Sequence, residues 1–236
     1  MKQYYSIAGL LVRMDTYGRT AVQAVPYLCK EAQPDVDLNV KEYREIILRR
    51  YPEADDDTCE YMASGGAFYK QLLRFDGFML HSSAVVLDGN VYLFTADSGT
   101  GKSTHTGLWL KQFGDRAYIL NDDKPALRCI DGKWYAFGTP WSGKNNISVN
   151  TGELVKGIAV IERGEKNEIT RLGGLEAIMA VMRQSNRPRD PESRTLLMEL
   201  LDKLLADVPV WKLRCNMDPE AAIVAYEAMS GEKWRK

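Results

Sequence analysis

The sequence predicts an α/β domain with a mixed β-sheet, hairpins and flanking helices around a P-loop, and three observations lead to this prediction. Apolar runs joined by Asp-Gly pairs at 88–89 and 131–132 are typical of β-hairpins. A glycine-rich segment at 96–103 stands between an apolar run and a helical pattern. Further helical patterns fill the C-terminal part. Hairpins combined with crossover helices favour a mixed rather than a purely parallel sheet.

The composition is that of an ordinary globular protein. The chain has 236 residues, of which 45% are hydrophobic and 27% charged. Its formal net charge of −1 provides no overall positive field to attract nucleic acid or an acidic membrane surface. The apolar run at the start is too short for a signal peptide, and no run reaches the roughly 18 residues of a membrane span. We therefore expect a cytoplasmic protein with no nucleic-acid or membrane partner.

The cysteines favour a structural role in the reduced state over a metal site. All four stand far apart, and no C-x-x-C pair exists in a chain with only two histidines. Reduced thiols are the usual state in the cytoplasm. The four cysteines are Cys29, Cys59, Cys129 and Cys215.

The N-terminal part reads as strand followed by helix. Residues 4–14 carry β-branched and aromatic side chains and predict one strand. Residues 38–48 fit either a strand or a helix. The acidic run 55–57 with Thr58 indicates a helix start, because such side chains satisfy free N–H groups there. A helix is predicted over 58–73.

The middle of the chain has the clearest pattern. Two apolar runs, 82–87 and 91–95, flank a turn and predict a hairpin whose second strand leads into the glycine-rich segment. Residues 103–113 predict a helix that ends at Gly114. Residues 117–120 then predict a short buried strand.

The C-terminal half predicts two further strand pairs and three helices. Asp218-Pro219-Glu220 is a strong helix start, because proline fits the first helical turn. The predicted strand pairs are 126–130 with 133–137 and 157–164 with 167–172, and the predicted helices are 174–185, 191–206 and 218–229.

The segment "ADSGTGKS", residues 96–103, predicts a phosphate-binding loop. Ala96 replaces the usual first glycine, which is tolerable where the backbone φ is negative. Gly99 and Gly101 let the backbone wrap an anion, and the N–H groups at the helix start would hold phosphates. Lys102 would bridge the β and γ phosphates, and the Ser103 hydroxyl would bind Mg²⁺. The alternative is a chance match in a Gly/Ser turn.

An acidic pair follows the strand at 117–120. Asp122 and Asp123 stand where a Walker B carboxylate is expected, at the mouth of a buried strand. One carboxylate would hold Mg²⁺, and the other would accept a proton from an attacking hydroxyl. The alternative is an Asx turn that Pro125 ends.

These residues together resemble the HPr kinase/phosphorylase and phosphoenolpyruvate carboxykinase superfamily over about residues 78–225. "SGTGKST" is similar to the loop shared by both branches. The other similar segments are "LHSSAVVLDG", "LNDDKPAL", "GTPWSGK" and "VPVWKLRCNMDPEAA". The resemblance implies a nucleotide-binding core at 78–225, with 1–77 as an N-terminal strand and helix layer of a single domain, 1–236.

The resemblance also implies site residues. Lys102 and Ser103 match the phosphate and magnesium positions, and Asp122 and Asp123 match the acidic pair, with Asp122 as metal ligand. His81 matches a histidine that faces the phosphate site, although a core histidine is the reading without the resemblance. The expected ATP-binding residues are Asp97, Ser98, Gly99, Thr100, Gly101, Lys102, Ser103, Thr104 and Lys144.

Three candidates outside the loop receive different expectations. Lys144, in the Pro/Gly/Ser loop "TPWSGKNN", would close over the phosphates or over the acceptor, and a solvated lysine is the alternative. His105 is expected to pack the helix or to support the site indirectly. Arg163 is interpreted as a surface residue and left out of the site.

The main hypothesis is an ATP- and Mg²⁺-dependent kinase that transfers the γ-phosphate to a serine-type hydroxyl of a peptide, protein or small molecule. The chain is too short for a phosphoenolpyruvate carboxykinase and lacks the longer glycine-rich signature of true HPr kinases. Two alternatives stay open: a nucleotide-binding module without turnover, and a phosphoserine phosphorylase or phosphatase. The acceptor and assembly into a homo-oligomer are also left open.

Overall fold

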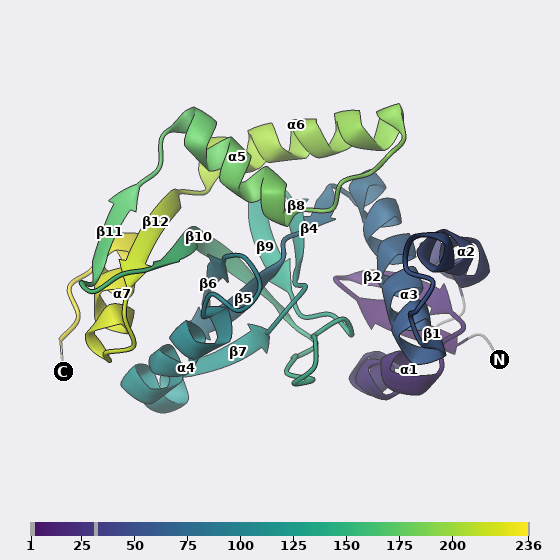
Figure 1. Ribbon diagram of the computed structural model, residues 1–236, viewed down its shortest axis with the longest axis horizontal. Helices are drawn as coiled ribbons and strands as arrows, with labels where there is room; N and C mark the ends of the chain where they lie inside the picture. Colours follow the sequence, from purple (N-terminus) through teal and green to yellow (C-terminus); the bar gives the residue numbers. More distant parts are fainter. Residues whose placement is uncertain (1–2, 31–32, 236) are drawn as a thin grey trace.

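Helices cover both faces of a large mixed sheet in the computed structural model, which describes residues 3–30 and 33–235 (Figure 1). Helices α5 (Gly174–Gln184) and α6 (Pro191–Asp207) bury apolar side chains against one face. Helices α4 (Lys102–Phe113) and α7 (Glu220–Ser230) pack on the other. The predicted α/β class with a mixed sheet and flanking helices is confirmed.

Among the residues that the structure describes, the main sheet has nine strands in the order β4-β8-β9-β10-β6-β5-β7, with β12 pairing to β10 and β11 to β12. The strands are β4 (Gly77–Met79), β5 (Ser82–Leu87), β6 (Asn90–Thr95), β7 (Ala117–Asn121), β8 (Ala126–Ile130), β9 (Lys133–Phe137), β10 (Gly152–Arg163), β11 (Glu168–Arg171) and β12 (Val210–Cys215).

Four strands end at the same edge of this sheet. Strand β10 runs parallel to both β6 and β12, with Val160 opposite Thr95 and Arg163 opposite Cys215. Strand β7 runs in the same direction, because β6 and β7 are both antiparallel to β5. The segments that follow β6, β7, β10 and β12 therefore meet at one edge, which is where α/β sheets place ligands.

Both Asp-Gly hairpins are confirmed, because their turns adopt the left-handed backbone that Asp-Gly favours. Asp88 and Gly89 have φ of 50° and 74°, and Asp131 and Gly132 have φ of 49° and 73°. Positive φ at both central residues matches the twist of the flanking strands.

The prediction of one strand over 4–14 is wrong. Ala8 and Gly9 have φ of 53° and 73° and make the same kind of turn, so the segment is a hairpin of β1 (Gln3–Ile7) and β2 (Leu10–Met14). Alanine seldom adopts a positive φ, so the apolar pattern concealed the turn.

The pairing of 157–164 with 167–172 is also wrong. Strand β12, which was not predicted, lies between them and is parallel to β10 and antiparallel to β11. Local spacing favours a hairpin, but pairing to β12 buries Leu213 and Cys215 against α7 and α4. Strand β4 was not predicted either.

The N-terminal part forms a smaller layer beside the main sheet (Figure 1). Its sheet has the order β1-β2-β3, with β3 at Val36–Asp37. The ambiguous segment 38–48 is helical, within α2 (Val40–Arg50). Helix α3 (Asp56–Leu72) begins as predicted, with the Asp55 carboxylate accepting from the Thr58 N–H at 2.7 Å. Helix α1 is Gly18–Ala24, and the 3₁₀ turn η1 is Val25–Tyr27.

Trp141 joins this layer to the main sheet. Its ring stacks on Phe68 with centroids 5.0 Å apart, and its indole N–H donates to the Ser64 hydroxyl at 3.0 Å. A Cβ at Gly65 would lie 3.0 Å from the Trp141 ring, which is a tight contact, so glycine at this position of α3 favours the close approach. Assignment of 1–77 as a separate layer of a single domain stays a prediction.

Glu60 is a buried carboxyl in α3 that makes stability depend on pH. Burial raises its pKa from 4.5 to about 7, and the negative charge of Asp57 adds to the rise. The hydroxyls of Thr20 and Ser64 and the positive charge of Arg19 lower the pKa but do not outweigh the burial. Both oxygens of the Glu60 carboxyl group are buried from water. The folded protein thus holds this proton where the unfolded chain releases it, so folding is weakened as pH rises from 4.5 to about 7.

We expect Glu60→Gln to remove this pH dependence, because a neutral amide has no charge to desolvate. The free energy of unfolding of the variant, relative to wild type, should rise by on the order of 3 kcal/mol between pH 4.5 and pH 8. Urea unfolding across this range measures it, with the exposed Glu53→Gln as control. Parallel stability curves for wild type and Glu60→Gln would contradict the prediction.

Candidate functional site

The segment between β6 and α4 is an open loop that ends on a helix N-terminus. Gly99 and Gly101 have φ of 77° and 130°, which side chains rarely allow. A Cβ at either position would meet nothing within 4 Å, so these glycines are required by conformation rather than by crowding. The loop presents backbone N–H groups ahead of α4, an arrangement that suits an anion.

Lys102 is the first residue of α4, and its side chain folds back over the loop. Its ammonium donates to the Ala96 carbonyl at 2.9 Å. Burial lowers the pKa of Lys102, while the carboxylates of Asp123, Asp122 and Asp97 oppose that shift. The Lys102 ammonium is half-buried and interacts electrostatically with these three carboxylates. It is well placed to bind an anionic ligand in a site where water screens charges weakly.

The loop and the acidic pair line one cavity of about 480 Å³. Ser103 and Thr104 come from the start of α4, Asp122 and Asp123 from the end of β7, and His81 from the segment before β5. The lining residues are His81, Ser98, Gly99, Gly101, Lys102, Ser103, Thr104, Asp122, Asp123, Ser142, Gly143, Lys144 and Asn145. The predicted residues Asp97 and Thr100 are not among them.

Asp122 is connected to the start of α4 through hydroxyl groups. It accepts from the Ser83 hydroxyl at 2.7 Å, and Ser83 contacts the Thr106 hydroxyl at 3.0 Å. Thr106 in turn contacts the Ser103 carbonyl at 3.3 Å. Asn145 donates to the other Asp122 oxygen at 3.1 Å. This network ties Asp122 to the backbone of the first turn of α4.

Asp123 is paired with the side chains of His81 and Lys124 instead. His81 Nε2 lies 3.2 Å from one carboxylate oxygen, and the Lys124 ammonium contacts the other. Burial raises the pKa of Asp123, but the hydrogen bonds and charges of His81 and Lys124 outweigh it and hold the pKa below its usual value. Asp123 is therefore a carboxylate at neutral pH.

Asp97 supports His81 rather than lining the cavity. It accepts from the Gln184 amide at 3.2 Å, which turns the amide oxygen of Gln184 toward His81 Nδ1, also at 3.2 Å. Gln184 was not singled out in the sequence because it lies at the end of α5, far along the chain.

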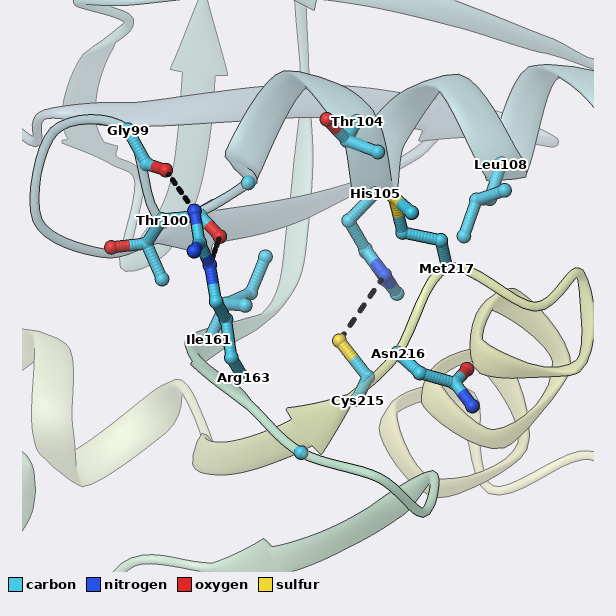
Figure 2. A pocket seen from close by; sticks show the side chains of 12 residues that line it. Gly99, Thr100, Thr104, His105, Leu108, Ile161, Arg163, Cys215, Asn216 and Met217 are labelled. Atoms are coloured by element: carbon cyan, nitrogen blue, oxygen red, sulfur yellow. Dashed lines mark hydrogen bonds between the residues drawn. The ribbon is translucent and has the colours of Figure 1, made fainter.

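A second pocket of about 480 Å³ lies against Gly99, Thr100 and Gly101 and carries more apolar side chains (Figure 2). Leu108, Ile161 and Met217 contribute apolar surface. The floor holds His105, whose Nε2 accepts from the Trp109 indole at 3.1 Å and whose Nδ1 lies 3.9 Å from the Cys215 sulfur.

His105 is a packing residue, as expected. Burial lowers the pKa of His105 to about 3, so the ring is neutral at physiological pH. It packs against Phe94 with the ring centroids 4.4 Å apart and the planes tilted by 58°. A neutral, fully paired imidazole supports the pocket floor and does not exchange protons with a ligand.

Arg163 is exposed, as interpreted, but its side chain also contacts the loop. Its guanidinium donates to the Gly99 carbonyl at 2.7 Å and to the Thr100 carbonyl at 3.2 Å, as Figure 2 shows. By engaging the carbonyls, Arg163 favours a loop conformation whose N–H groups are left for an anion. The parallel pairing of β10 and β6 brings it there, and that long-range pairing was not predicted from the sequence.

Comparisons with known proteins give a structural likeness at low sequence identity. No protein-family model matches the chain, and no curated protein matches its sequence. Among solved structures, the Hpr(Ser) kinase/phosphatase from Coxiella burnetii aligns with a TM-score of 0.36 and 13% identity, over 65% of this chain and 95% of that chain. In the part of the chain described, no helix is both long and apolar enough to cross a bilayer. The chemistry of the site is therefore derived from this chain's own residues.

Proposed function

We propose that this protein is an ATP- and Mg²⁺-dependent kinase that phosphorylates a hydroxyl group. The observation that carries the proposal is a single cavity containing a glycine-rich loop, the ammonium of Lys102 and two carboxylates. The helix N-terminus and Lys102 suit the β and γ phosphates, and the carboxylates suit a metal and a hydroxyl proton.

The donor set fits magnesium. Carboxylate and hydroxyl oxygens are the ligands that Mg²⁺ takes in nucleotide sites, usually from one or two side chains plus phosphate. Asp122 and Ser103 would hold the ion, since both line the same cavity and carry a carboxylate and a hydroxyl oxygen. Bound there, Mg²⁺ would neutralise charge on the phosphate oxygens.

Asp123 would act as the general base. It faces the same cavity and is a carboxylate at neutral pH. His81 contacts it at 3.2 Å and fixes its orientation. A hydroxyl placed beside Asp123 would lose its proton to the carboxylate as its oxygen attacks the γ-phosphorus, and the bond to the bridging oxygen of ADP would break.

The second pocket would receive the nucleoside. It shares Gly99, Gly101 and Thr104 with the phosphate cavity, so one molecule could extend from one to the other. Its apolar wall of Leu108, Ile161 and Met217 suits the faces of a base.

Transfer of labelled phosphate tests the proposal. Purified protein with γ-labelled ATP is mixed with a pool of serine peptides and small alcohols, with Mg²⁺ or with a chelator. We expect labelled product that disappears with the chelator. Nucleotide affinity measured by calorimetry in parallel separates a missing acceptor from a missing nucleotide site. Absence of any magnesium-dependent ATP binding would contradict the proposal.

A further inference from the structure

Exposed apolar side chains stand beside the loop that closes the phosphate cavity. Val22 and Val25 lie on α1 and η1 and are 65% and 58% exposed. Ile147 and Val149, directly after the cavity residues 142–145, are 41% and 43% exposed. We call these four residues the rim patch. Single exposed apolar residues are ordinary, but four on two adjoining segments next to a cavity indicate a contact surface.

Hydrogen bonds hold the two segments of the rim patch together. Side chains from α1 and the 148–150 segment cross between them at three points. The contacts are Gln23 amide to Gly143 carbonyl at 2.9 Å, Asn150 amide to Pro26 carbonyl at 3.2 Å, and the Tyr27 hydroxyl with the Ser148 hydroxyl. The patch is therefore continuous with the wall of the cavity, and one ligand would touch both.

The backbone at Ser148 forms an isolated antiparallel bridge with Asn121 at the end of β7, and its other edge pairs with no strand of the described residues. The Ile147 carbonyl accepts from the Asp122 N–H at 3.1 Å, and the Val149 N–H donates to the Leu120 carbonyl at 2.9 Å. Since these groups alternate in direction along an antiparallel ladder, the N–H and C=O of Ser148 face away from β7. Neither forms a backbone hydrogen bond with the described residues. An extended polypeptide is the partner that satisfies such an edge.

Lys144 supplies charge between the patch and the cavity. Its exposed ammonium forms no ion pair or hydrogen bond with any residue that the structure describes, although it lines the cavity. A carboxylate on the ligand would pair with it.

We propose that the rim patch docks an extended polypeptide segment that carries the acceptor hydroxyl, with apolar side chains beside the hydroxyl-bearing residue and an acidic side chain near Lys144. The inference rests on the proposed kinase function and selects a polypeptide over a small metabolite. A metabolite would fill the cavity without reaching Val22 or Val25.

Binding of a random peptide library tests the docking without requiring catalysis. Displayed short peptides are selected on wild-type protein with Mg²⁺ and a non-hydrolysable ATP analogue. We expect enriched sequences with apolar and acidic residues around a serine or threonine. Val25→Asp and Ile147→Asp should each weaken binding of the enriched peptides by roughly tenfold or more. Leu175→Asp, on α5 and 77% exposed, is the matched control and should bind as wild type does.

Affinity for the ATP analogue and the thermal midpoint, measured on every variant, show that the protein is folded and its nucleotide site intact. Peptides that bind the rim patch but are never phosphorylated would contradict the proposed kinase function and still support the docking of a polypeptide. If wild type, Val25→Asp and Ile147→Asp transferred phosphate equally well, the docking of a polypeptide on the rim patch would be wrong. The proposed kinase function would still stand. A dimer in sedimentation that Ile147→Asp dissociates would also overturn the docking, because a second copy would then occupy the patch.

Discussion

Lys102→Ala is expected to lower kcat/KM for phosphate transfer on the order of 10³-fold, the cost of losing one preorganised charge partner at a transferring group. The ammonium is half-buried, its pKa is lowered by that burial, and its hydrogen-bond partner in the structure is a carbonyl of the loop, at 2.9 Å. A phosphate would replace that carbonyl. Single-turnover transfer from labelled ATP measures the effect.

A lysine elsewhere on the same helix provides the control. Lys111 lies in the last turn of α4 and is exposed, so Lys111→Ala changes the same charge without touching the cavity. It should transfer phosphate at the wild-type rate. If Lys102→Ala kept wild-type kcat/KM while both proteins were folded, the assignment of this loop to the phosphates would be wrong.

Asp123→Asn is expected to reduce kcat on the order of 10²–10⁴-fold, the usual contribution of a general base, with little change in ATP affinity. The amide is nearly isosteric but accepts no proton at neutral pH. It also leaves His81 and Lys124 without their carboxylate partner. Pre-steady-state transfer and calorimetric ATP binding together measure the two quantities.

Asp122→Asn separates the two carboxylates. Because Asp122 is assigned to the metal, the loss of activity in Asp122→Asn should become smaller as the Mg²⁺ concentration is raised. The loss of activity in Asp123→Asn should stay the same. Asp115→Asn, an exposed carboxylate before β7, should behave as wild type. If Asp123→Asn regained activity at high Mg²⁺ concentration, Asp123 would be the metal ligand and Asp122 the general base.

The local elements of the fold could be predicted from the sequence where a residue type is typical of a turn or of a helix start. Asp-Gly at 88–89 and 131–132 marks two hairpins, and Asp55 with Thr58 marks the start of α3. The Ala8-Gly9 turn was missed because alanine rarely adopts a positive φ and is not typical of such turns. Strand β12 was missed because its partner β10 ends 47 residues before β12 begins, and local spacing favoured a hairpin with β11.

The chain by itself determined the loop at 96–103, the carboxylates after β7 and the class of fold, because turn chemistry and hydrophobic pattern act over a few residues. Tertiary structure alone decided which other side chains stand there. Parallel pairing of β6, β10 and β12 places Arg163 on the loop, and α5 brings Gln184 to His81. Trp141, packed on α3, lies close in the chain to Lys144, which lines the cavity. Such contacts depend on which distant segments bury one another, and a one-dimensional pattern does not encode that choice locally.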